Sequence, residues 1–497
     1  AADGRAPAHG TRARPAALLA VLVGVVAFGA RAYLLRYAQL TGEGTYDDAV
    51  HFSGSLALVH GRLPYRDFLF LHPPMVLLAL TPFAGLAQVT SESFGFAAAR
   101  VAWMLLGAFN AIAVTRLLRP LGLLSALVGG LAYALYFPAA YAESTTMLEG
   151  LANAFLLSSL LLLAGRRTRG RVLGAGILLG LVPAVKIWGV VMVAVVLVWA
   201  WAIRGLRHAL AVALAAAGSC ALVVLPFFLA APARMWTMVV AAQLGRPELV
   251  MATPEERIWV MLGLFGRPPG AAVAFVLAGL AAVVVGLALW RAREFAAAWL
   301  GVGLLVPMTW LLMVTPSFYG HYPAAIAVPF AITLGAAVTL APAPGHRMAW
   351  LGSLALLPVV LAWATAADLH LAQSHTGADV RFAALAPAVA HAGGCVTSED
   401  PAPLIELGLV GRNIARGCPV WIDLTGHYLI DNIGQGLPMP DDPAYQEQVM
   451  TYLRSGSVAI LGREYATRSL SEANLRIVDS WPVLARSDAY TARRVPH

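Results

Sequence analysis

The sequence predicts a polytopic α-helical membrane protein that carries an α/β domain at its C-terminal end. Of its 497 residues, 59% are hydrophobic and 12% are charged, whereas soluble domains carry roughly 25% charged residues. A soluble protein cannot use this much apolar sequence, because its surface must be covered with polar groups. The charge is also uneven, since residues 1–367 hold 24 basic and 12 acidic side chains while residues 368–497 hold 10 and 14. We therefore expect a membrane domain over 1–367 and a second domain over 368–497, with no nucleic-acid partner.

The membrane domain is expected to contain about 11 transmembrane helices, because a helix of about 20 apolar residues crosses a bilayer. The predicted spans are 16–35, 94–115, 121–141, 145–165, 172–186, 187–203, 209–229, 271–290, 296–314, 323–341 and 348–367. The first has no small-residue cleavage pattern, so we expect a retained helix and not a signal peptide. Basic residues gather in alternate loops, which places the N-terminus in the cytoplasm. An odd number of crossings then puts the C-terminal domain on the outer side of the plasma membrane.

The first outer loop, about residues 37–93, is long compared with the other loops, and long ordered loops are more often functional. Phe52, Leu56 and Val59 recur at helical spacing, which predicts a helix along the membrane surface. Met75–Val89 is apolar but short and contains Pro82. It favours an interfacial or re-entrant helix over a full crossing.

Polar residues of this loop are the first candidates for a site. Asp47 and His51 stand one helical turn apart and would share a face; the alternative is that Asp47 and Asp48 only start a helix by opposing its dipole. His72 precedes Pro73 and Pro74, and proline is well tolerated at a helix start. His72 is therefore expected at the membrane surface.

Lys186 is the only lysine among 34 basic residues, and it lies where two apolar spans meet. A cation in this position usually has a partner. A lipid phosphate suits its compact charge, although a lysine that only extends to the headgroups is the alternative. Glu149 starts an apolar helix, where capping and binding of a sugar hydroxyl are both open. The remaining outer candidates are Arg246, Tyr319, His321 and Tyr322.

The outer domain alternates strand-like and helix-like segments, which predicts a small α/β domain. Residues 394–397, 419–423 and 457–461 are expected as strands, and 445–454 as a helix. Cys395 and Cys418 are the two cysteines of this domain. They could form a disulfide in an oxidising compartment; the alternative is two buried thiols.

Taken together, the membrane region resembles the GT-C superfamily of polytopic glycosyltransferases, such as protein O-mannosyltransferases, lipid A aminoarabinose transferases and actinobacterial mannosyl- and arabinofuranosyltransferases. The resemblance covers about three quarters of the chain, and many relatives have Asp-Glu where this chain has Asp47–Asp48. The residues that carry it are Asp47–Asp48, Pro64–Tyr65 after Gly61, His72–Pro73–Pro74, Lys186, Phe318–Tyr319, His321–Tyr322 and Pro329.

The resemblance implies transfer of a sugar from a polyprenyl-phosphate donor to an acceptor hydroxyl on the outer face of the membrane. Asp47 would be the base that removes the acceptor proton, and Asp48 would orient the acceptor or the base. Lys186, with His72 or His321, would hold the leaving phosphate. The residues expected to bind substrate are His51, Tyr65, Glu149, Arg246, Tyr319 and Tyr322.

One base and no covalent intermediate would invert the anomeric centre. No cofactor is expected. A divalent metal could sit on the two adjacent acids, but a third ligand is not evident, so the reaction is not expected to need one. Mannose and arabinofuranose are the favoured sugars, since an Ala- and Arg-rich chain suggests a high-GC actinobacterium. A glycan, a glycolipid and a protein hydroxyl all stay open as acceptors.

Other functional classes fit parts of the pattern. A transporter or lipid flippase would use Lys186 and acidic partners as a path, yet the chain shows no two related halves. An enzyme that uses a lipid pyrophosphate would need an Arg-rich outer site, and a membrane scaffold would need only its outer domain. Walker, GxGxxG, HExxH and CxxC motifs are absent from the sequence, which disfavours ATP-driven transport, nicotinamide chemistry and zinc proteolysis.

Overall fold

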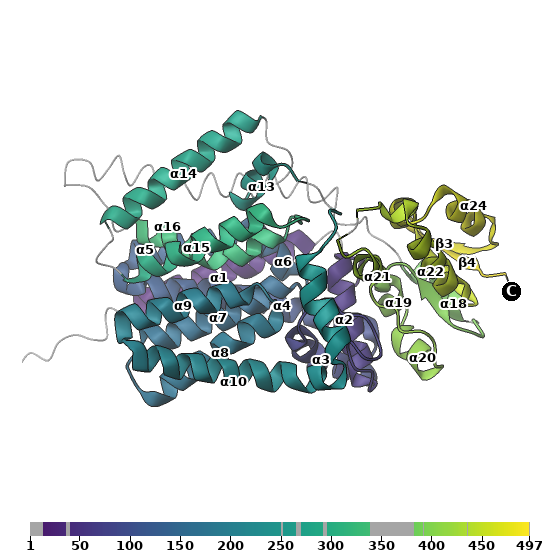
Figure 1. Ribbon diagram of the computed structural model, residues 1–497, viewed down its shortest axis with the longest axis horizontal. Helices are drawn as coiled ribbons and strands as arrows, with labels where there is room; N and C mark the ends of the chain where they lie inside the picture. Colours follow the sequence, from purple (N-terminus) through teal and green to yellow (C-terminus); the bar gives the residue numbers. More distant parts are fainter. Residues whose placement is uncertain are drawn as a thin grey trace, which may run out of the picture.

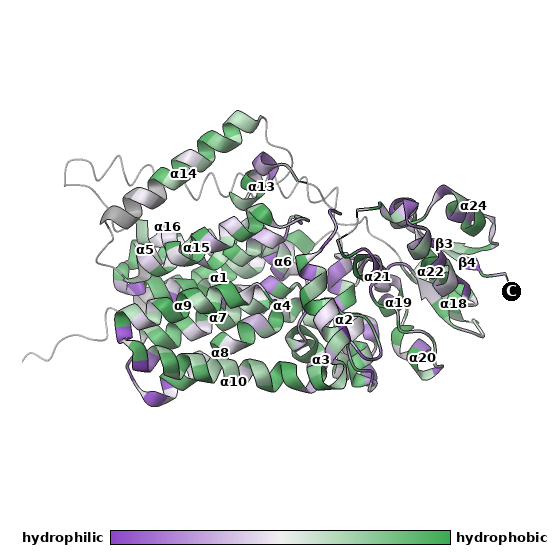
Figure 2. Ribbon diagram, in the orientation of Figure 1, coloured by the Kyte–Doolittle hydropathy of each residue, from purple (hydrophilic) through white to green (hydrophobic). Residues whose placement is uncertain are grey.

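A computed structural model describes residues 13–35, 40–249, 252–264, 270–291, 296–337, 382–390, 392–434 and 436–496. The helices of the membrane domain lie side by side in one bundle, and the C-terminal domain lies beyond one end of it (Figure 1). Hydrophobic residues dominate the bundle, and hydrophilic residues are more frequent in the C-terminal domain (Figure 2). This arrangement confirms the predicted fold class.

The bundle is built from helices that follow the predicted spans closely. They are α1 (Ala13–Leu35), α4 (Glu92–Leu118), α5 (Leu123–Leu135), α6 (Phe137–Ser144), α7 (Leu148–Ala164), α8 (Arg169–Val185), α9 (Gly189–Arg204), α10 (Leu206–Ala230), α14 (Ala271–Arg291), α15 (Ala296–Val314) and α16 (Ala327–Ala337). Short helical segments join them: η1 (Arg119–Leu121), α11 (Pro232–Trp236), η2 (Thr237–Ala241), α12 (Ala242–Leu244), α13 (Pro254–Met261) and η3 (Tyr322–Ile326).

Ten of the predicted spans coincide with these helices, and the eleventh, 348–367, lies outside the described residues. By length and composition, three described helices could cross a membrane alone: α1, α4 with η1, and α10. The bent pair α5 and α6 makes a fourth if it counts as one span, and several apolar helices are shorter. The number of crossings therefore stays a prediction.

The predicted span 121–141 is broken at Tyr136, where α5 and α6 meet at 55°. Pro138 explains the break, because proline has no amide hydrogen to donate to the carbonyl four residues earlier and its ring crowds that carbonyl. The carbonyl concerned belongs to Ala134, and it accepts a hydrogen bond from Arg31 Nη1 at 3.0 Å instead. The break thus leaves a carbonyl that the buried cation Arg31 of α1 satisfies.

The first outer loop folds into α2 (Tyr46–Val59) and α3 (Met75–Val89). The side chain of Thr45 caps α2 by accepting from the Asp48 amide at 3.3 Å, and Asp47 and Asp48 occupy its first turn, where acids are favoured. Between the helices, Tyr65 has a φ of 67°, unusual for a residue with a side chain. Its hydroxyl donates to the His72 carbonyl at 2.6 Å and fixes the segment that precedes α3.

The C-terminal domain is a four-stranded sheet with helices packed around it. The strands are β1 (Val396–Ser398), β2 (Val458–Gly462), β3 (Val483–Arg486) and β4 (Tyr490–Arg494), in the order β1-β2-β4-β3. Only the pair β1 and β2 is parallel. The helical segments are η6 (Phe382–Leu385), α18 (Ala386–Ala390), α19 (Pro401–Glu406), α20 (Val410–Ala415), α21 (Leu424–Asp431), η7 (Met439–Asp441), α22 (Pro443–Arg454), α23 (Arg463–Ser469) and α24 (Glu472–Ser480).

Two features of this domain differ from the prediction. Residues 419–423 form no strand; they lead into α21, whose N-terminus is capped by the Asp423 side chain. The hairpin of β3 and β4 was not predicted. Cys395 and Cys418 are joined in a disulfide, and the predicted boundary at 367/368 lies outside the described residues.

The two parts meet where α19 packs against α2 and α4 and where α20 packs against α2. The Glu92 carboxylate accepts from the amides of Val410 at 3.0 Å and Gly411 at 2.7 Å. The Tyr46 hydroxyl donates to Asp423 at 3.1 Å. The C-terminal domain is thereby held against α2, whose first turn contains Asp47.

Candidate active site

A cavity of about 1140 Å³ lies between the ends of the membrane-domain helices and the C-terminal domain. Its walls come from segments far apart in the chain: the start of α2, the start of α7, the junction of α8 and α9, and the loops around 245–249 and 316–322. Residues of α21 and of the loop before η7 form the opposite wall. The predicted residues that line it are Asp47, His51, His72, Glu149, Lys186, Arg246, Tyr319, His321 and Tyr322.

Asp47 presents its carboxylate to this cavity. Its side chain is 43% exposed, and Oδ2 lies 3.9 Å from Nε2 of His321. Asp47 is therefore a carboxylate that a substrate can reach, held on the first turn of a helix.

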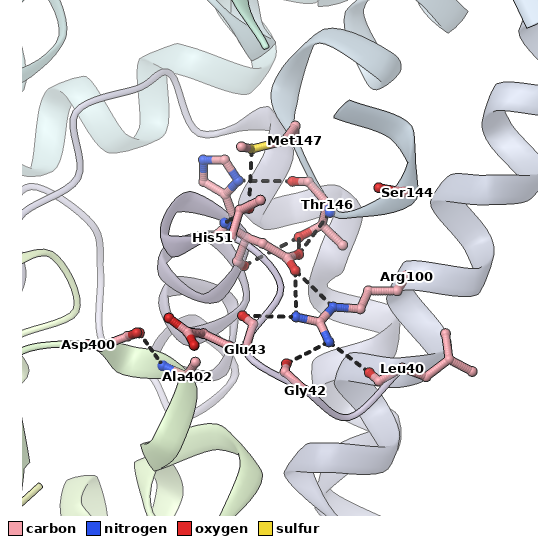
Figure 3. A network of polar contacts seen from close by, with 12 residues as sticks. Leu40, Gly42, Glu43, His51, Arg100, Ser144, Thr146, Met147, Asp400 and Ala402 are labelled. Carbon is pink, nitrogen blue, oxygen red and sulfur yellow. Dashed lines mark hydrogen bonds and ion pairs between the residues drawn. The ribbon is translucent and has the colours of Figure 1, made fainter. Parts of the chain in front are cut away.

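Asp48 points the other way and is fully buried. Its Oδ2 accepts from Nε of Arg100 at 2.8 Å, and its Oδ1 accepts from the Thr146 amide at 2.8 Å. Nη1 of Arg100 also donates to the carbonyls of Leu40 and Gly42, at 2.8 and 2.9 Å. Figure 3 shows this network between the loop before α2, Arg100 and Thr146. Asp48 thus joins α2 to α4 and to the segment before α7, and it does not line the cavity.

Because Asp48 is occupied by Arg100 and Thr146, the two adjacent acids do not present two carboxylates to one ligand. Within the described ranges, no group of three or more His, Cys, Asp or Glu side chains is placed to hold a metal ion.

Lys186 lies at the end of α8, where the chain turns into α9. Its Nζ donates to Oε1 of Glu149 at 2.5 Å and lies 4.1 Å and 4.3 Å from the ring centres of Trp188 and Tyr322. An ammonium has three N–H donors. Glu149 uses one of them, and the two aromatic faces stabilise the charge of Lys186.

A second cation, Arg246, lies near the ring of Tyr319, with its Cζ 5.5 Å from the ring centre. Tyr319 stacks on His321 with ring centres 5.8 Å apart and contacts Tyr322 at 5.2 Å. Nε of Arg246 is buried and has no hydrogen-bond partner among the residues that the structure describes. This wall therefore offers an N–H donor of a charged group that nothing in the described chain uses.

The two histidines of the first outer loop lie together, with ring centres 5.9 Å apart. His51 donates from Nδ1 to the Thr146 carbonyl at 2.9 Å. Burial, with Lys186 and His51 nearby, holds the pKa of His72 well below its usual range. Burial also lowers the pKa of His321, although Glu149 and Asp47 oppose the shift. Both shifts favour the neutral imidazole, which can form hydrogen bonds but carries no charge.

Tyr65 does not line the cavity. Its side chain is buried and serves the His72 segment, as described above. Tyr65 was predicted to bind substrate, but in the structure it supports the segment that carries His72 and does not reach the cavity.

Several cavity residues were not predicted: Tyr46, Tyr141, Asp423, Thr425, Tyr428 and Arg468. Asp423 is the carboxylate of the C-terminal wall; burial raises its pKa to about 6, and Asp47 contributes to the shift. Tyr46 could have been inferred from its place beside Asp47. The sequence alone could not identify Asp423 as a cavity residue, because Asp423 reaches the cavity through the packing of the C-terminal domain against the membrane domain.

Several solved structures are similar to this protein. No protein-family model matches the sequence, and no curated protein sequence matches it. The structure of ArnT from Cupriavidus metallidurans bound to undecaprenyl phosphate has a TM-score of 0.58 at 14% identity, over 97% of this chain and 98% of that chain. AglB from Archaeoglobus fulgidus, in complex with an inhibitory peptide and a dolichol-phosphate, gives 0.54 at 12% identity, over 93% and 72%.

The arabinofuranosyltransferase AftD from Mycobacteria gives a TM-score of 0.51 at 17% identity. The match covers 97% of this chain and 40% of AftD. These likenesses extend over both parts of the chain, and they show that this protein shares the fold of these three proteins.

Proposed function

We propose that this protein transfers a sugar from a polyprenyl-phosphate donor to an acceptor hydroxyl, on the outer face of the plasma membrane. The observation that carries the proposal is one cavity lined both by the reachable carboxylate of Asp47 and by the cations Lys186 and Arg246. The likeness to ArnT solved with undecaprenyl phosphate and to AglB solved with a dolichol-phosphate supports a lipid-phosphate donor. Mannose and arabinofuranose are the sugars we favour.

Asp47 is the proposed base. An acceptor hydroxyl must lose its proton as it attacks the anomeric carbon, and a fixed carboxylate within reach can take it. Asp48 is unsuited to this role because Arg100 and Thr146 already occupy its oxygens. Its proposed role is to hold the first turn of α2, and with it Asp47, at the cavity wall.

Lys186 and Arg246 are the proposed ligands of the donor phosphate. The bond between the anomeric carbon and the phosphate oxygen breaks during transfer, and negative charge grows on the departing lipid phosphate. Fixed cations lower the energy of that transition state. His72 and His321, in their neutral form, would donate hydrogen bonds to the same group. Displacement with one base inverts the anomeric centre.

The orientation of the chain is part of the proposal. The positively charged loops support a cytoplasmic N-terminus, and the predicted odd number of crossings then makes the cavity and the C-terminal domain extracytoplasmic. The acceptor is a glycan, glycolipid or protein hydroxyl that approaches between the membrane helices and the C-terminal wall, where Asp423, Thr425 and Tyr428 line the cavity.

The test is transfer by membranes that contain the protein, with labelled polyprenyl-phosphate mannose and polyprenyl-phosphate arabinofuranose offered in parallel. Label should reach a lipid, protein or glycan fraction from one of the two donors. Transport of the label across proteoliposomes that hold no acceptor, without any transfer product, would contradict the proposal and indicate a flippase.

A further inference from the structure

The cavity contains a second unused polar atom besides Nε of Arg246. Oε2 of Glu149 is buried and has no hydrogen-bond partner among the described residues, although the side chain of Glu149 lines the cavity. A buried acceptor without a donor costs about 1–3 kcal/mol. Such an atom, on a wall of a substrate cavity, points to a ligand group that donates a hydrogen bond.

The chemistry of Oε2 limits what that group can be. The phosphodiester of a glycosylated lipid phosphate has no proton to donate, so it cannot satisfy a carboxylate oxygen, whereas a hydroxyl of its sugar can. The other oxygen of the same carboxylate, Oε1, holds Nζ of Lys186 at 2.5 Å. The unused oxygen therefore lies beside the cation that is proposed to bind phosphate, where the sugar attached to that phosphate must lie.

The unused atoms on the two sides of the cavity have opposite character. Nε of Arg246 is a donor and Oε2 of Glu149 is an acceptor. A series of contacts links the two residues: Arg246 lies near the ring of Tyr319, Tyr319 stacks on His321, and Nε2 of His321 lies 4.0 Å from Oε1 of Glu149. A ligand that presents an anion to one side and a hydroxyl to the other satisfies both. A glycosyl phosphate is such a ligand, and it would bind in one direction only.

We propose that Glu149 binds a hydroxyl group of the donor sugar through Oε2, and that this contact distinguishes a sugar-bearing lipid phosphate from the sugar-free product. The inference rests on the proposed function, because it assumes a lipid-phosphate donor. It assigns different parts of the donor to different residues. Arg246 and Lys186 bind the phosphate group, which donor and product both have, and Glu149 binds the sugar, which only the donor has.

The experiment measures binding of two probes to the purified full-length protein without acceptor. One probe is a polyprenyl phosphate, and the other is the same lipid phosphate carrying mannose or arabinofuranose, whichever the wild type binds more tightly. The readout is the ratio of the two dissociation constants. Glu149→Gln should reduce the preference for the glycosylated probe about tenfold, which corresponds to the loss of one hydrogen bond to a charged group.

Two further variants separate this role from a structural one. Arg246→Ala should weaken both probes, and the sugar-free probe at least as much because its phosphate monoester carries more negative charge, so the preference for the glycosylated probe should not fall. Glu149→Asp keeps the charge that holds Lys186 but withdraws the carboxylate by one methylene, so it should lower the ratio while binding of the sugar-free probe is retained. Glu447→Gln removes an exposed carboxylate that does not line the cavity, so it is the control and should leave the ratio as in the wild type.

The outcomes are distinct. If Glu149→Gln and Glu149→Asp keep the wild-type ratio, or weaken both probes equally, the contact with the sugar does not exist, while the proposed donor class stands. If the wild type binds neither probe, the proposed function itself is wrong.

Discussion

Two buried acids, Glu143 and Glu149, stand six residues apart, and each is paired with a single cation, yet their surroundings differ completely. Glu143 and its partner Arg31 are fully buried. Oε2 of Glu143 accepts from Nε of Arg31 at 2.8 Å, and Oε1 accepts from Asn110 at 2.8 Å and from Tyr133 at 2.6 Å. Every oxygen of this carboxylate is used by the protein.

Glu149 lies on the cavity, pairs through one oxygen with Lys186, and leaves the other oxygen without a partner in the described chain. The same contrast separates Asp48, whose oxygens are both bonded, from Asp47, whose carboxylate is exposed. Burial and pairing alone therefore do not distinguish structural from functional acids here. What distinguishes them is whether the protein itself uses all of their hydrogen-bonding capacity.

The largest expected effect comes from the adjacent pair Asp47 and Asp48. Asp47→Asn should lower the rate of transfer by about 10²- to 10⁴-fold, the usual contribution of a general base, and leave the unfolding temperature unchanged. Asp48→Asn should lower the unfolding temperature as well, because it leaves Arg100 buried without its counter-charge. Transfer rates and thermal unfolding of purified variants in detergent would check both. Wild-type transfer by a folded Asp47→Asn variant would end the assignment of the base.

The second prediction concerns the buried ion pair of Arg31 and Glu143. Arg31→Met should destabilise the protein by about 3–5 kcal/mol, because it leaves Glu143 as an uncompensated buried charge. Adding Glu143→Leu should recover part of this loss, since two apolar side chains replace the pair. Unfolding in increasing denaturant measures the stability of Arg31→Met and of the double variant Arg31→Met/Glu143→Leu. If Arg31→Met alone were the more stable of the two, the comparison would be contradicted.

Lys186→Met should instead reduce the rate of transfer more than it reduces stability, because Glu149, the partner of Lys186, faces the cavity.

Features set by local sequence were predictable. The helix from Met75 to Val89 spans the predicted residues, because Pro73 and Pro74 precede an apolar run. Asp47 and His51 both line the cavity, as their spacing of one turn implies. Lys186 lies between two helices because two short apolar runs meet there.

Features set by distant contacts were not predictable. Asp48 and Arg100 are separated by 52 residues, so the sequence could not show that one member of the Asp47–Asp48 pair is occupied. The partner of Lys186, Glu149, lies 37 residues away on another helix. Asp423 reaches the cavity only because Tyr46 and the amide of Gly426 hold it there. Periodicity assigns a residue to a helix face but says nothing of what that face meets.

The smallest expected effect concerns a third kind of acid, Glu406, which lies between the two parts of the protein and accepts a hydrogen bond from Ser93. Burial raises its pKa from 4.5 to about 7, although Ser93 and Arg100 oppose the shift. The folded protein therefore holds this proton more tightly than the unfolded chain. The resulting stabilisation is complete below about pH 4.5 and is lost as the pH rises through about 7.

Stability should accordingly decrease from pH 5 to pH 8, with Glu406 contributing a slope of at most about 1.4 kcal/mol per pH unit, less where solvent screens it. Glu406→Gln should remove this contribution, and the difference between the two unfolding curves isolates it from other acids such as Asp423. Glu447→Gln, on the exposed side of α22, should retain the wild-type slope. Equal slopes for wild type and Glu406→Gln would mean that Glu406 is ionised in the folded protein. The ionised carboxylate of Glu406 would then need hydrogen-bond donors in addition to Ser93, just as the carboxylate of Glu143 has several donors.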